Sequence, residues 1–192
     1  MNISEPIWLR LSRRSDRMMY PFLSAALPVL VPASVPEMTL AEFDSLMSGH
    51  LSGRLYARMT AWDDPQARVK VPLYAEMQRF IDCMEYRIAM LRAEKLKVNA
   101  AFEEPGEFFG EVDHALSHAA SCGALEREKL LDALLWRKLD ELEVGHELDF
   151  YHLCIYRIRL SLLQKYARRD EAAGRDNFES ALEQLAASFN EP

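Results

Sequence analysis

The spacing of apolar residues is most regular over residues 125–169, where it predicts a helical hairpin. In the first arm, leucines recur every three or four residues, so they share one face of a helix and leave charged residues on the other. These leucines are Leu131, Leu134, Leu135, Leu139 and Leu142. Gly145 is expected to end this arm, because glycine adopts the left-handed conformation of a helix terminus without strain. Asp149 is expected to cap the second arm.

The second arm carries two apolar stripes on roughly opposite sides, so we expect it to be a central helix. One stripe is formed by Tyr151, Ile155, Ile158 and Leu162, and the other by Leu153, Tyr156, Leu160 and Leu163. Arg157 and Arg159 also lie in this helix, where an unpaired charge is costly. Their predicted partners are carboxylates of the first arm, Asp140, Glu141 or Glu143, in ion pairs that fix the helix register. An anion-binding site is the alternative interpretation of the two arginines.

Patterns along the rest of the chain predict further helices separated by short breaks. Thr39 and Glu42 fit a capping box at the start of the first. The longest one follows Pro72 and starts at about residue 73. Its predicted buried stripe consists of Leu73, Met77, Phe80, Ile81, Met84, Ile88 and Leu91. These helices are expected to end at residues 47, 62, 102, 120 and 189. Only residues 20–30 also fit the alternating apolar pattern of a strand. The sequence therefore predicts an all-α, single-domain bundle of about six to seven helices, with a long central helix and a C-terminal helical hairpin.

Residues 1–17 are expected to be an unstructured basic extension of a helical domain that covers residues 18–192. They carry arginines at positions 10, 13, 14 and 17, and residues 18–36 contain no charge. This order is similar to that of a secretory signal with a twin-arginine pair, which is the alternative interpretation. Prolines at positions 21, 28, 32 and 36 interrupt the uncharged stretch and argue against a membrane span.

Composition and charge narrow the class of protein. The 192 residues are 49% hydrophobic and 28% charged, as in an ordinary globular protein, and the net charge of -7 argues against nucleic-acid binding. Residues 1–100 hold 13 basic and 11 acidic side chains, whereas residues 101–192 hold 10 and 19. Such asymmetry suggests two faces with different partners, although solvated helix surfaces produce it as well. Cys83, Cys122 and Cys154 lack a C-x-x-C spacing, so we expect reduced cysteines without a zinc site.

Candidate chemistry is sparse, and no catalytic, cofactor-binding or metal-binding residue is predicted. His114 and His118 are four residues apart next to Asp113 and could face one metal ion, but a further ligand is missing. Glu143 and His146 have the Glu-x-x-His spacing of di-iron bundles, which need two such motifs on facing helices. The chain has no G-x-S-x-G elbow, phosphate-binding loop or dinucleotide-binding glycine pattern. An enzyme is therefore disfavoured, and neither a cofactor nor a small-molecule substrate is expected.

Phe108 and Phe109 lie between two glycines in an acidic stretch. Their spacing to apolar residues of the following helix, among them Val112 and Leu116, predicts that both belong to the core. An exposed aromatic wedge that binds a partner is the alternative interpretation.

Four parts of the chain share their order and pattern with a known family. They are residues 20–28 (YPFLSAALP), Glu42-Phe43, the Tyr86-Arg87 and Leu91-Arg92-Ala93 positions of the long helix, and residues 136–146 (WRKLDELEVGH) with the apolar residues that follow. In these parts the chain resembles a bacterial family that is encoded in operons of V-type ATPases and is related to the C/d-type subunits of these motors. The resemblance begins at about residue 20. The chain is shorter than a full C/d-type subunit, which is built from three similar helical units.

The resemblance implies a non-enzymatic subunit or accessory protein that couples the central stalk of the rotary motor to the membrane rotor ring. The expected partners are stalk and rotor-ring subunits. The expected location is cytoplasmic, at the inner face of the membrane and held there only through these partners. The chain would serve proton or other ion transport by passing torque through rigid helices. Two alternatives stay open: a small helical-bundle enzyme with a metal at His114 and His118, and a general cytosolic helical adaptor.

Overall fold

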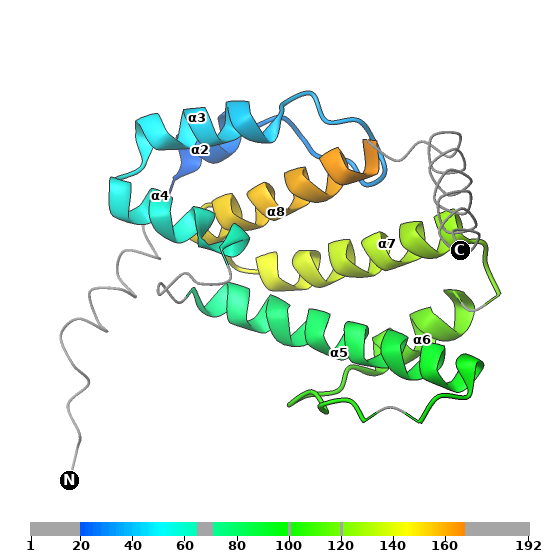
Figure 1. Ribbon diagram of the computed structural model, residues 1–192. Helices are drawn as coiled ribbons and strands as arrows, with labels where there is room; N and C mark the ends of the chain where they lie inside the picture. Colours follow the sequence, from blue (N-terminus) through cyan, green and yellow to red (C-terminus); the bar gives the residue numbers. More distant parts are fainter. Residues whose placement is uncertain (1–19, 65–70, 100, 120, 168–192) are drawn as a thin grey trace, which may run out of the picture.

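The computed structural model describes residues 20–64, 71–99, 101–119 and 121–167, and these residues form a compact helical bundle without a strand (Figure 1). The predicted all-α fold is confirmed. In chain order the elements are α2 (Pro21–Ala26), α3 (Leu40–His50), α4 (Gly53–Thr60), the 3₁₀ turn η1 (Ala61–Asp63), α5 (Pro72–Leu96), α6 (Gly110–Ala119), α7 (Ala124–Glu143) and α8 (Phe150–Ala167). The expected extension over residues 1–17 and the final helix ending at residue 189 lie outside the described residues.

Residues 20–30 do not form the strand that their pattern left open. Pro21 opens helix α2, in the first turn, where its missing N–H is not needed for an intrahelical bond. Leu27 is extended, as expected for a residue that precedes a proline. The backbone N–H of Tyr20 donates to the carbonyl of Leu148 at 2.6 Å, which ties this segment to the turn between α7 and α8.

The capping box at the start of α3 is confirmed. The Glu42 N–H donates to Thr39 Oγ1 at 3.2 Å, and the Thr39 N–H donates to Glu42 Oε2 at 2.8 Å. Helix α3 continues to His50, past the predicted end at residue 47. The single helix predicted for residues 51–62 is instead α4, which Ser52 caps, followed by the short turn η1.

The predicted hairpin is confirmed as α7 and α8, which run side by side in opposite directions (Figure 1). Gly145 has a φ of +82° just past the end of α7, so it occupies the left-handed region that favours glycine. Asp149 caps α8, because its Oδ1 accepts the N–H of Tyr151 at 2.7 Å. His146 closes the turn through a 2.6 Å contact between its Nδ1 and Asp149 Oδ2.

Helix α8 is the centre of the larger hydrophobic core, as its two apolar stripes predict. Its buried residues are Phe150, Leu153, Cys154, Ile155, Tyr156, Arg157, Ile158, Leu160 and Leu163. Tyr156 stacks on Phe43 of α3 with 5.1 Å between ring centroids, and its hydroxyl donates to the Pro28 carbonyl at 2.9 Å. Burial raises the pKa of Tyr156 to about 12. We call this region the α8 core.

Helix α5 starts at Pro72, one residue before the predicted start, and ends at Leu96, so the predicted end at residue 102 is wrong. Lys97 adopts the left-handed conformation with a φ of 54°, and its N–H donates to the carbonyls of Ala93 and Glu94. The backbone therefore closes the helix with an αL cap. The buried residues of α5 all lie in its first half.

None of the described helices is both long enough and apolar enough to cross a bilayer.

A second, smaller hydrophobic cluster joins α5, α6 and α7. Its buried members are Phe80, Cys83, Met84, Val112, Leu116 and Leu134. Leu135 of α7 packs against this cluster and against the α8 core, so α7 connects the two. The candidate site lies next to this smaller cluster.

Candidate functional site

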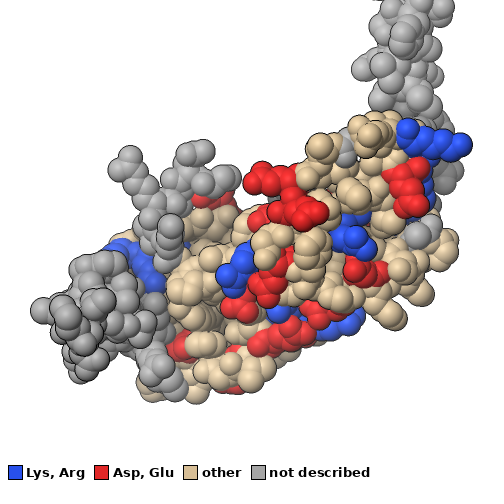
Figure 2. Space-filling model, turned by 90° about the horizontal axis from the view of Figure 1, so that it is seen from below, with Lys and Arg blue, Asp and Glu red and all other residues tan. Residues whose placement is uncertain are grey.

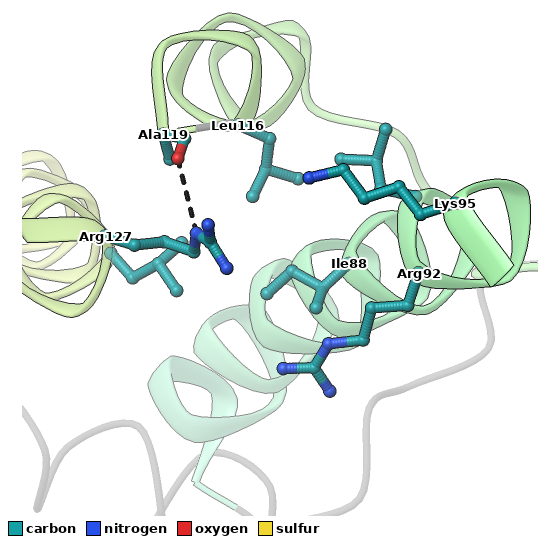
Figure 3. Close-up of a pocket in the computed structure, with 8 residues that line it drawn as sticks. Ile88, Arg92, Lys95, Leu116, Ala119 and Arg127 are labelled. Atoms are coloured by element: carbon teal, nitrogen blue, oxygen red, sulfur yellow. Dashed lines mark hydrogen bonds between the residues drawn. The ribbon is translucent and has the colours of Figure 1, made fainter. Parts of the chain in front are cut away.

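The second half of α5, together with α6 and the start of α7, encloses a hollow with a volume of about 120 Å³ (Figure 3). Its apolar lining consists of Ile88, Leu91, Leu116, Ala119 and Leu131. Its charged lining consists of Arg92, Lys95 and Arg127. We call these eight residues the α5–α6–α7 groove. An apolar floor with a few charged groups at its rim is the usual make-up of a binding site.

Arg127 is held at the rim of the groove by the end of α6. Its Nε donates to the Ala119 carbonyl at 3.3 Å, and its Nη2 donates to the Cys122 carbonyl at 3.2 Å. The Ala119 carbonyl belongs to the C-terminal end of α6, where the partial negative charge of the helix favours a cation, and Cys122 lies in the turn that follows. Figure 3 shows the Arg127 side chain extending from α7 toward the space beside Ile88 and Leu116.

Arg92 and Lys95 contribute two further positive charges from α5. They are three residues apart, so they lie on neighbouring positions of one helix face, and both are exposed. Neither makes an ion pair with a carboxylate in the part of the chain that the structure describes. No acidic side chain is among the described residues that line the groove. The groove therefore has a positive rim around an apolar floor, which suits an amphipathic, negatively charged ligand.

Exposed apolar side chains continue beyond the groove along α5. Leu91 is 38% exposed, Leu96 73% and Val98 56%, and Leu91 and Val98 also line an adjacent hollow. The stripe predicted along α5 was expected to bury Leu91, which is wrong, because α6 covers α5 only as far as the groove. A contiguous exposed apolar surface beside polar groups is typical of an interaction site.

The surface seen from below in Figure 2, on the side of α5 and α6 in Figure 1, carries acidic and basic side chains next to one another. Helix α5 makes two exposed ion pairs with residues at and just before α6: Arg87 with Asp113, and Arg79 with Glu107 at 3.5 Å. Such exposed pairs contribute little to stability. They contrast with the rim of the groove, where the cations face apolar side chains.

Arg157 lies in the α8 core and does not form the predicted ion pair with α7. Its Nε and Nη2 each lie 2.8 Å from an oxygen of Asp44, and its Nη1 lies 2.6 Å from Asp63 Oδ2. Burial alone lowers the pKa of Arg157, but the hydrogen bonds with Asp44 and Asp63 outweigh burial and raise it. Two carboxylates already neutralise this arginine, so the geometry is that of an internal ion pair.

Arg159 does reach the carboxylates predicted for it on α7. It pairs with Asp140, and its Nη1 lies 2.6 Å from Glu143 Oε2. His152 Nδ1 lies 2.6 Å from the other oxygen of Glu143. Burial raises the pKa of Glu143, but the hydrogen bonds with His152 and Arg159 outweigh this effect and lower it. The Glu-x-x-His spacing is thus not used, because Glu143 pairs with His152 and His146 with Asp149.

The candidate metal ligands do not form a site within the described residues. His114 and His118 are both exposed on α6, and Asp113 pairs with Arg87 of α5. No group of three histidine, cysteine or carboxylate side chains with metal-binding geometry occurs in the described ranges. Within the same ranges, His114 and His118 have no third ligand beside them.

Phe108 and Phe109 have different environments, so the prediction that both are core residues is half right. Phe109 packs edge-on against Phe80 at 5.1 Å, and Lys138 lies over the Phe109 ring at 5.3 Å. Phe108 is 56% exposed and touches Tyr86 edge-on at 5.9 Å. Lys138 was expected on the solvated face of α7, and its packing on aromatic rings was not predicted.

The groove was not predicted from the sequence, although one signal was present. Arg92 and Lys95 follow the last residues of the apolar stripe on α5, and a helix that stops burying its stripe leaves a half-covered surface. Arg127 could not be found this way, because its role depends on where α6 ends.

No family model matches this chain, and no curated protein or solved structure matches it either. The resemblance to the C/d-type subunits of V-type ATPases accordingly stays a prediction.

Proposed function

We propose that this chain is a non-catalytic helical binding protein that accepts an acidic amphipathic helix in the α5–α6–α7 groove. The observation that carries the proposal is the combination of an apolar floor with three cations, Arg92, Lys95 and Arg127. Helix-in-groove recognition uses apolar anchors spaced by three or four residues, and flanking charges set the orientation of the helix.

The groove dimensions support a helix as the ligand. The lining residues of α5 run from Ile88 to Lys95, which is about 10 Å along the helix axis at ~1.5 Å per residue. This length matches about two turns of a bound helix, with apolar anchors one turn apart. Carboxylates on the flank of such a helix would then lie near Arg92 and Lys95 of α5 and near Arg127 of α7.

The particular partners that we propose are stalk or rotor-ring subunits of a bacterial V-type ATPase. Support for this choice comes from the resemblance of residues 20–28 and 136–146, together with the all-helical fold. In that role the chain would couple the stalk to the ring as a subunit or accessory protein, at the cytoplasmic face of the membrane and through its partners alone.

A pull-down of the full chain with stalk and ring subunits tests both parts of the proposal. We expect at least one of them to be retained by the wild-type chain and lost with Arg92→Glu combined with Lys95→Glu. Arg54→Glu is a single charge-reversal control, because Arg54 is an exposed arginine on α4 and does not line the groove. If every stalk and ring protein passes through unbound, the V-type ATPase assignment is wrong. If they bind equally to all three proteins, they use another surface.

A further inference from the structure

The last described helix, α8, ends on the far side of α7 from the α5–α6–α7 groove. Because α8 returns antiparallel to α7, its last turns lie against the first half of α7: Leu162 and Tyr166 share a small hollow with Lys129 and Asp132. The groove lies around the same half of α7, whose Arg127 contributes to its rim. Helix α8 therefore ends at Ala167 against the same half of α7 that borders the groove, with α7 between them.

The sequence that follows has the chemistry that the groove requires. Residues 176–189 contain three acidic side chains, Asp176, Glu179 and Glu183, and no basic one. Apolar residues occur at positions 178, 182, 185 and 189, with the spacing of a single helical stripe. On a helix, the acidic residues would lie along one flank of this stripe.

We propose that residues 176–189 of this chain occupy the α5–α6–α7 groove of the same molecule and compete there with the partner helix. Leu182 and Leu185 fill the hollow between Ile88 and Leu116, and Glu179 and Glu183 face the cations of the rim. The inference rests on the groove of the proposed function, not on the V-type ATPase as partner. It makes the groove a regulated site that a partner opens by displacing an internal ligand.

The connecting length allows this arrangement. Residues 168–175 separate the end of α8 from the acidic segment, and these eight residues span up to about 28 Å when extended. This limit exceeds the diameter of α7, about 10–12 Å, which the connection must pass. A short tether also raises the effective concentration of the segment at the groove to about the millimolar range, so a weak contact is sufficient for occupancy.

Competition gives a measurable signature in the full chain. If the tethered segment occupies the groove nine-tenths of the time, the apparent affinity for an added ligand falls roughly tenfold. A fluorescent synthetic peptide of residues 174–192 serves as that ligand, and fluorescence anisotropy measures its Kd. We expect this peptide to bind a Leu182→Asp and Leu185→Asp chain about tenfold more tightly than the wild-type chain.

A matched control separates release of the segment from added negative charge. Ser180→Asp with Gln184→Asp adds the same two acids off the apolar stripe, so the Kd of the peptide should equal that of the wild-type chain. Adding Arg92→Glu and Lys95→Glu to the released chain should weaken peptide binding, and a peptide with Glu179→Lys and Glu183→Lys should recover it. Circular dichroism melts confirm that each variant is folded.

Two results would overturn the inference: equal Kd values for the wild-type and released chains, or no peptide binding to either. A wild-type chain that is dimeric by light scattering, with a monomeric Leu182→Asp and Leu185→Asp variant, would assign the groove to a second copy and also overturn it. The outcome is independent of the ATPase pull-down. If the chain binds no ATPase subunit, only the proposed partner is wrong. If the Kd values are equal, only the proposal that residues 176–189 occupy the groove is wrong.

Discussion

The α8 core and the α5–α6–α7 groove use charge in opposite ways. In the α8 core, Arg157 is 4% exposed and its guanidinium contacts both Asp44 and Asp63. In the groove, the cations Arg92 and Lys95 are exposed and lie beside apolar side chains. The buried ion pair holds the helices in one arrangement, because removing either partner leaves an unpaired buried charge. An exposed cation beside apolar side chains can still pair with a charge on a ligand.

The difference follows from how completely neighbouring helices cover each apolar surface. Helix α8 is apolar on two sides, and α3 and α7 lie against it, so residues such as Leu153 and Ile155 are fully buried. Helix α5 is longer than the helices that cover it, so its stripe is buried at Met77 and Phe80 but exposed at Leu91. The apolar surface is thus fully covered around α8 and partly exposed at the end of α5.

The largest difference between the regions should appear when leucines are truncated. Leu160→Ala removes a fully buried side chain of the α8 core and should lower the free energy of unfolding by about 3–5 kcal/mol. Leu96→Ala, at a position that is 73% exposed, should change it by less than about 0.5 kcal/mol. Urea unfolding measures both values. Similar losses at the two positions would mean that the end of α5 is covered as completely as α8.

The next effect concerns the buried ion pair. Asp44→Ala should cost about 2–3 kcal/mol, because it removes two hydrogen bonds from a buried guanidinium that keeps only Asp63. Arg157→Met should cost less, since it leaves carboxylates that water can reach. Chemical unfolding of both variants at neutral pH provides the test. A larger loss for Arg157→Met would show that the arginine contributes mainly by packing.

The sequence was sufficient for elements whose pattern is local. The leucine stripe of α7, the two stripes of α8, Gly145 in the turn and the Thr39 capping box all depend on residues within a few positions of one another, and all were predicted. Two of the carboxylate partners named for Arg159 were also correct, because the hairpin brings α7 and α8 together.

Features that depend on the packing of distant segments were not predicted. Asp44 and Asp63 reach Arg157 only after α3 and η1 fold over α8, so nothing near Arg157 in the sequence reveals them. The end of α5 was missed for another reason: Lys97 takes a left-handed φ that usually belongs to glycine or asparagine. The groove depends on both kinds of feature, because the end of α5 at Leu96 and the position of α6 together leave its apolar side chains exposed.

The stabilisation of the fold by Glu143 should depend on pH, and it should be smaller than the effects of Leu160→Ala and Asp44→Ala. The folded chain lowers the pKa of Glu143 below 4.5, so the stabilisation by its carboxylate is fully present above about pH 4.5 and is lost as the pH falls through the folded value. Glu143→Gln should therefore cost about 1–2 kcal/mol at pH 7 and less at pH 3. Urea unfolding at both pH values tests this, with exposed Glu141→Gln as the control. A cost for Glu143→Gln that is equal at the two pH values would contradict it.

The smallest expected effect on stability belongs to the groove itself. Arg92→Glu combined with Lys95→Glu should change the free energy of unfolding by less than about 0.5 kcal/mol, because both side chains are exposed and neither is paired within the described residues. Urea unfolding at neutral pH measures it, with Arg54→Glu on α4 as a single charge reversal outside the groove. A loss above about 1 kcal/mol with the groove variant alone would show that these cations stabilise the fold, and the division between a closed core and an open binding end would then be wrong.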